Sequence, residues 1–124
     1  MSTREISRAD WPAFMDCFSR QHLGWLSTIE VLDSTLGAQT QVREQPFAGI
    51  TAETHGGHSS IAILMGKGPD LHVGHLIRDA AHVRLKESDG AHEALQIEAG
   101  DGVTTLLTFR SVMPTELVDG VVMQ

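Results

Sequence analysis

The chain has 124 residues, of which 41% are hydrophobic, so it is long enough to bury one core, and we expect a single domain over residues 1–124. Its formal net charge is −7 with nine Lys and Arg, which excludes a sequence-independent nucleic-acid binder and disfavours binding to a membrane surface, because both need clustered positive charge. No stretch approaches the roughly 18 apolar residues of a spanning helix, and a single cysteine excludes internal disulfides, so we expect a cytoplasmic protein.

The N-terminal pattern predicts a short tail followed by a helix. Residues 1–5 contain no apolar run, and we expect them to be a poorly ordered tail, as we do residues 113–124. Asp10 is the expected N-cap, Pro12 falls in the first turn, where its missing N–H is not needed, and the helix should end near Gly24. An apolar stripe at helical spacing should pack on a sheet face: Trp11, Phe14, Met15 and Phe18.

Short apolar-alternating segments follow the helix and predict strands. One of them should end at Gln45-Pro46, because proline removes a ladder donor and belongs at an edge or a turn. Gly-rich turns separate the later segments. The predicted strands cover residues 25–32, 38–43, 47–53, 59–65 and 71–77.

The stretch over residues 80–111 has the pattern of an antiparallel meander. Three alternating segments are separated by Asp89-Gly90 and by Gly100-Asp101-Gly102, which tolerate the positive φ of a tight reversal. We expect Leu85, Ile97 and Leu107 on a common sheet face. The predicted fold is therefore α+β and mainly β: an N-terminal helix packed on a curled antiparallel sheet, a half-barrel or barrel of about seven short strands.

Several motifs carry a family resemblance. They are a Trp-Pro-x-Phe helix start at residues 11–14, Gly-Trp-Leu at residues 24–26 and Thr-Leu-Leu-x-Phe-Arg-Ser at residues 105–111. With them the chain resembles a family of small bacterial proteins catalogued as a domain of unknown function. The motifs consist mostly of apolar and turn residues, so the resemblance implies no activity and no functional residue.

Two pairs of histidines are the sharpest chemical feature of the sequence. His55-x-x-His58 lies in a Gly-Gly turn, and His72-x-x-His75 lies in the strand that precedes the meander. Imidazole is a good zinc ligand, and the four rings would close a tetrahedral site if their two strands formed a hairpin. Against this, His72 and His75 point to opposite faces of a strand, and no Cys or carboxylate stands at a zinc spacing. We therefore expect structural or incidental histidines, no cofactor and a core position for His75, with a zinc site as the alternative.

The sequence leaves two functions open. We favour a small non-enzymatic domain that acts as a homo-oligomer or binds a protein partner, because no catalytic set converges; an edge strand or the doubly apolar strand at residues 103–110 would supply its interface. Cys17, beside Phe14 and Phe18, is expected to be a buried residue rather than a nucleophile. The alternative is a metal-binding or small-ligand-binding protein, hydrolases included, centred on His55, His58, His72 and His75.

Overall fold

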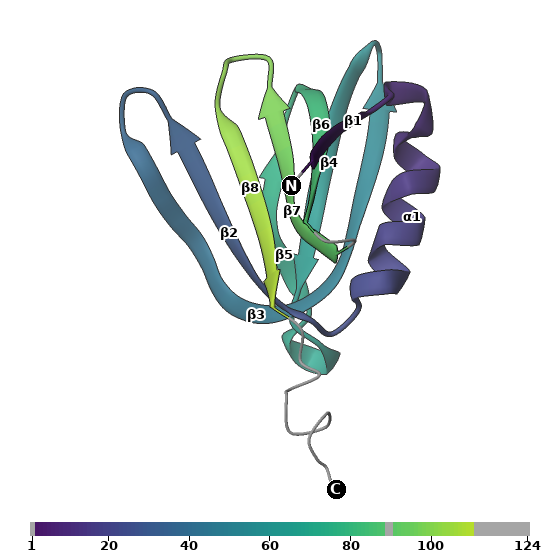
Figure 1. The fold of residues 1–124 in the computed structure, drawn as a ribbon, viewed down its shortest axis with the longest axis vertical. Coiled ribbons are helices and arrows are strands. Elements are labelled where there is room, and N and C mark those ends of the chain that lie inside the picture. Colours follow the sequence, from purple (N-terminus) through teal and green to yellow (C-terminus); the bar gives the residue numbers. More distant parts are fainter. Residues whose placement is uncertain (1, 89–90, 111–124) are drawn as a thin grey trace, which may run out of the picture.

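In the part of the chain that the structure describes, one α-helix packs on a curled antiparallel sheet, as the sequence predicts. The computed structural model describes residues 2–88 and 91–110. In these residues eight strands form one sheet in the order β1-β6-β7-β8-β2-β3-β4-β5. The sheet curls into an open half-barrel and does not close into a barrel (Figure 1). The strands are β1 (Ser2–Ile6), β2 (Leu26–Asp33), β3 (Gly37–His55), β4 (His58–Met65), β5 (His72–Ile77), β6 (Ala80–Ser88), β7 (Ala91–Ala99) and β8 (Thr104–Arg110).

Helix α1 (Trp11–His22) confirms the helix prediction, and Pro12 lies in its first turn. A short 3-10 helix, η1 (Arg8–Asp10), leads directly into it. Asp10 is the N-cap residue of α1, as predicted, but it has helical dihedral angles and its side chain makes no capping hydrogen bond. The stripe is buried at Trp11, Met15 and Phe18, while Phe14 is partly buried against the core.

The meander is confirmed as β6, β7 and β8. Leu85 pairs with Leu95, which pairs in turn with Leu107, and Val83, Ile97 and Thr105 form the neighbouring row. Leu85, Ile97 and Leu107 are each fully buried, so they share one face of the sheet as expected. The turn at Asp89-Gly90 lies outside the described residues.

The prediction that a strand ends at Gln45-Pro46 is wrong, because β3 runs without a break from Gly37 to His55. Its first half pairs with β2 and its second half with β4, and the change of partner takes place at Pro46. A register shift next to Glu44, which has a φ of 48°, bends the strand there. Pro46 is tolerated at this junction, and its carbonyl accepts a hydrogen bond from Gly66 N at 2.8 Å. In Figure 1, β3 passes beneath the half-barrel from the outlying β2–β3 hairpin to the side of α1.

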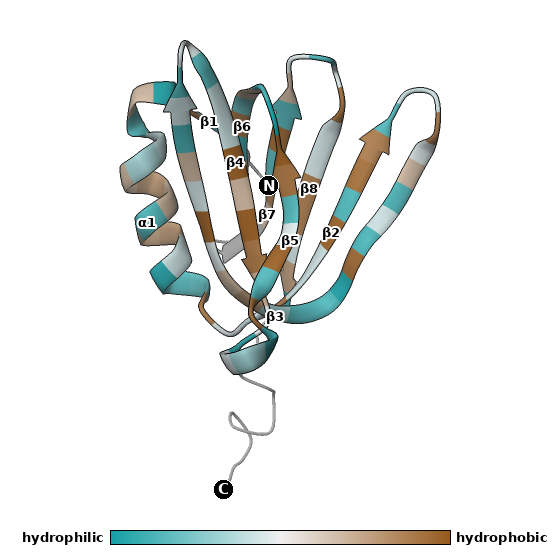
Figure 2. Ribbon diagram, turned by 180° about the vertical axis from the view of Figure 1, so that it is seen from behind, coloured by the Kyte–Doolittle hydropathy of each residue, from teal (hydrophilic) through white to brown (hydrophobic). Residues whose placement is uncertain are grey.

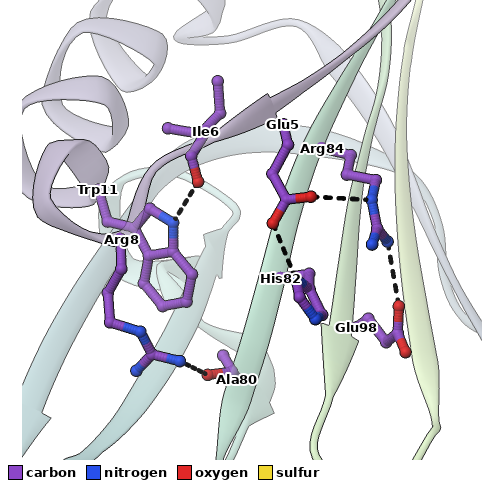
Figure 3. Close-up of polar contacts among 8 residues, drawn as sticks. All are labelled: Glu5, Ile6, Arg8, Trp11, Ala80, His82, Arg84 and Glu98. Atoms are coloured by element: carbon purple, nitrogen blue, oxygen red, sulfur yellow. Dashed lines mark hydrogen bonds and ion pairs between the residues drawn. The ribbon is translucent and has the colours of Figure 1, made fainter.

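The prediction that residues 1–5 form a poorly ordered tail is wrong, because β1 lies there and pairs antiparallel with β6. Ile6 is 4% exposed, and its carbonyl accepts a hydrogen bond from the Trp11 indole at 3.0 Å (Figure 3). A strand with one buried apolar residue and a partner some 80 residues away leaves no local pattern in the sequence. Residues 113–124, the other expected tail, lie outside the described residues.

The core fills the space between the meander, the β3–β4 hairpin and α1. Phe18 contacts Phe47 and Phe109 edge to face, with ring centroids 6.2 and 5.4 Å apart, so the helix joins β3 to β8. Figure 2 shows hydrophobic segments along β4, β7 and β8. No helix in the described part of the chain is long and apolar enough to cross a membrane.

Candidate functional site

Strand β5 lies at one end of the sheet, and within the described residues it pairs only with β4. Leu71, which precedes it, and Val73 are 54% and 55% exposed, and Leu76 is 44% exposed. An edge strand presents unpaired N–H and C=O groups along its open side. Exposed apolar side chains beside such an edge are typical of a surface that pairs with another chain.

Strand β1, at the other end of the sheet, has a charged rather than an apolar edge. Glu5 accepts a hydrogen bond from His82 Nδ1 at 2.8 Å, and Arg84 lies between Glu5 and Glu98, at 3.5 and 3.0 Å (Figure 3). The hydrogen bond from His82, with Arg84 nearby, lowers the pKa of Glu5. Charged side chains on an edge strand disfavour pairing with another chain.

Helix α1 covers the edge of the second half of β3, where β3 no longer pairs with β2. The Ser19 hydroxyl accepts a hydrogen bond from Ile50 N at 2.9 Å and donates one to Ile50 O at 3.2 Å, in place of a neighbouring strand. The doubly apolar strand β8 is also enclosed, because it lies between β7 and β2. Its outward residue Leu106 is half-buried between Gln96 and Glu30. Among the described strands, β5 therefore offers the apolar open edge.

A hollow of about 270 Å³ lies where the end of β5 faces β2 and β8. His75 and Arg78 line one side of it, and Val103 and Thr105 line the other. His75 is half-buried, and burial lowers the pKa of its imidazole, which favours the neutral ring. Asp101 lies at the hollow, and its carboxylate accepts a hydrogen bond from Val103 N at 3.0 Å.

The structure brings together only part of the predicted histidine set. His55 and His58 pair across the β3–β4 turn and line an open hollow of about 260 Å³ with Arg78 and Asp79. The His58 ring Nδ1 donates a hydrogen bond to Asp79 Oδ1 at 2.9 Å, and both side chains are largely exposed.

The other pair of histidines lies apart from the β3–β4 turn. His72 pairs with Met65 at the far end of β4, where its ring donates a hydrogen bond to Asp70 O at 2.7 Å, and His75 faces the 270 Å³ hollow. Across the described ranges, no three His, Cys, Asp or Glu side chains are arranged to hold a metal ion. A zinc site on all four histidines stays a prediction from the sequence.

Two residues of α1 have environments that the sequence did not predict. Cys17 is exposed, so the expectation that it is buried is wrong: it lies one residue before Phe18 and turns about 100° away from the buried stripe. His22, which the sequence analysis passed over, is 2% exposed and packs between the rings of Phe18 and Phe109, with centroids 4.2 and 4.6 Å away. Its position four residues after Phe18 was the signal that it continues the stripe.

The hollow beside β5 contains two residues that the sequence analysis did not single out. Arg78 belongs to no motif in the sequence, and its side chain is exposed. Thr105 lies among apolar residues on the buried face of β8. Only the fold places the turn after β5 across from β8, so no local pattern pointed to this pair.

Comparison with curated proteins and with solved structures found no match. A family model described as "Family of unknown function (DUF5335)" matches residues 2–118, which is nearly the whole chain. The resemblance noted from the helix and strand motifs is thereby confirmed at the level of a family without an assigned function. The chain belongs to this family, DUF5335.

Proposed function

We propose that the protein is a non-enzymatic interaction domain that self-associates through the open edge of β5. The observation that carries the proposal is the exposure of Leu71 and Val73, at 54% and 55%, beside an edge that no other described strand covers. Antiparallel pairing of two identical edges is self-complementary, so one surface patch serves both copies of a two-fold dimer. We keep the cytoplasm as the proposed location, because a lone exposed cysteine suits a reducing compartment.

Substitution Val73→Lys tests the proposal, because it places a charge at the expected contact while Val73 is already exposed and its loss leaves the core intact. Desolvating an unpaired ammonium should weaken association by about tenfold or more. Light scattering over a wide range of protein concentration should show the wild-type mass rising above 13.5 kDa, and the variant should remain near that value.

Thr3→Lys is the matched control, because Thr3 is an exposed residue of β1 at the opposite edge. It should associate like the wild type. A wild-type protein that stays at 13.5 kDa at every concentration would rule out self-association. Equal weakening by Thr3→Lys and Val73→Lys would remove β5 as the contact.

A further inference from the structure

We infer that the 270 Å³ hollow between β5, β2 and β8 binds a small carboxylic acid with a short apolar body, held through Arg78 and Thr105. This inference goes beyond the proposed self-association. Leu71 and Val73, which carry that proposal, do not line the hollow.

Arg78 supplies a positive charge without a carboxylate partner in the described part of the chain. The two acidic side chains that line the hollows with Arg78 have hydrogen-bond donors of their own: Asp79 accepts from His58 at 2.9 Å, and Asp101 accepts from Val103 N at 3.0 Å. A guanidinium at the rim of a concave surface binds carboxylates well, because its planar donors match two carboxylate oxygens. The guanidinium of Arg78 therefore supplies the group that an anion would bind, while Asp101 at the same hollow keeps its own negative charge.

Thr105 supplies a polar group at the opposite wall. The residue is 2% exposed and stands in a row of apolar side chains between Ile97 and Val31. Within residues 2–88 and 91–110 its hydroxyl has no hydrogen-bond partner, yet no fully buried side-chain N or O atom there is unpaired. The hydroxyl must therefore be the part of Thr105 that reaches the hollow, where a ligand oxygen would satisfy it.

The remaining walls set the size and character of the ligand. Val31, Leu76 and Val103 are apolar, and 270 Å³ is close to the lower end of the range of about 300–1,000 Å³ for ligand pockets. His75 adds a neutral imidazole rather than a second charge, since burial lowers its pKa. A single carboxylate on a short aliphatic body matches one cation, one hydroxyl and apolar walls.

The test is a titration of the full chain with sodium hexanoate, followed by amide chemical shifts in NMR spectra. We expect saturable shifts at residues 75–78 and 103–105. Hexan-1-ol, which keeps the apolar body and removes the charge, should bind about tenfold more weakly, because a charge-assisted hydrogen bond is lost. Equal affinity for the alcohol and the acid would overturn the inference, as would shifts confined to other parts of the sheet.

Three substitutions complete the test. Arg78→Gln should weaken hexanoate binding by about tenfold and Thr105→Val by severalfold, while Arg43→Gln, at an exposed arginine on β3, should bind like the wild type. Arg78 is exposed, so its variant remains folded and the result does not depend on Thr105→Val. Identical binding by Arg78→Gln and Arg43→Gln would overturn the inference. Val73→Lys should keep full hexanoate affinity, which separates this outcome from that of the self-association test.

Discussion

At the scale of single residues, His75 shows how a strand position determines ionisation. Its ring lies against the hollow near Arg78 and Asp101, and burial lowers the pKa of the imidazole below its ordinary value of 6.5. The unfolded chain therefore takes up a proton at a higher pH than the folded chain does. The contribution of the neutral ring to stability is complete above about pH 6.5 and is lost as the pH falls through the folded-state pKa.

Substitution His75→Gln should therefore reduce the pH dependence of stability on the acid side of neutrality. We expect the free energy of unfolding of the wild type to fall more steeply between about pH 7 and pH 5 than that of the variant. Urea unfolding at a series of pH values measures both slopes. Gln41→Ala, which removes no titratable group at an exposed position of β3, should retain the wild-type slope. Parallel curves for the wild type and His75→Gln would contradict the role of burial.

At the scale of elements, Ser19 replaces a strand neighbour. Beyond Pro46, β3 has left β2, and the N–H and C=O of Ile50 would be unpaired on that side without the Ser19 hydroxyl. Gly49 lies next to this contact, and a Cβ there would stand 3.6 Å from Ser19 Oγ, an ordinary contact distance. The helix is thus joined to the sheet by hydrogen bonds as well as by its apolar stripe.

Substitution Ser19→Ala should lower the free energy of unfolding by about 1–3 kcal/mol, because two partly buried backbone groups lose their partner. Chemical denaturation measures the change. Cys17→Ala is the control on the same helix and should change stability by no more than about 0.5 kcal/mol, since Cys17 is exposed. A Ser19→Ala variant as stable as the control would show that water replaces the hydroxyl at Ile50 without cost.

Elements with a local pattern were predictable, and those that depend on distant partners were not. The meander and α1 have a clear period of two and of 3.6 residues, so β6, β7, β8 and the stripe on α1 were foreseen. Strand β1 and the continuity of β3 through Pro46 depend on pairing with β6, β2 and β4, which no window of neighbouring residues contains. The candidate site follows the same division: the apolar β5 was visible in the sequence, whereas the approach of Arg78 to Thr105 was not.

At the scale of the whole molecule, β1 closes one end of the sheet and also supports α1. Deleting residues 2–6 removes the burial of Ile6, worth about 2 kcal/mol, and the carbonyl partner of the Trp11 indole, worth about 1 kcal/mol. We expect a loss of about 3 kcal/mol, read from thermal unfolding together with tryptophan fluorescence. Arg4→Ala, at an exposed residue of β1, should leave stability nearly unchanged. A deletion variant with the stability of the wild type would show that residues 2–6 contribute nothing to the free energy of unfolding, as expected of a tail.

The contact of Phe18 with Phe109 has a consequence for biosynthesis. Helix α1 leaves the ribosome well before Phe109, which belongs to β8, and β1 must wait for β6. The contact of Phe18 with Phe47 can form once β3 is translated, but the side of Phe18 that faces Phe109 stays uncovered until β8 follows. During that interval the nascent chain exposes an aromatic surface at Phe18, which a chaperone would recognise.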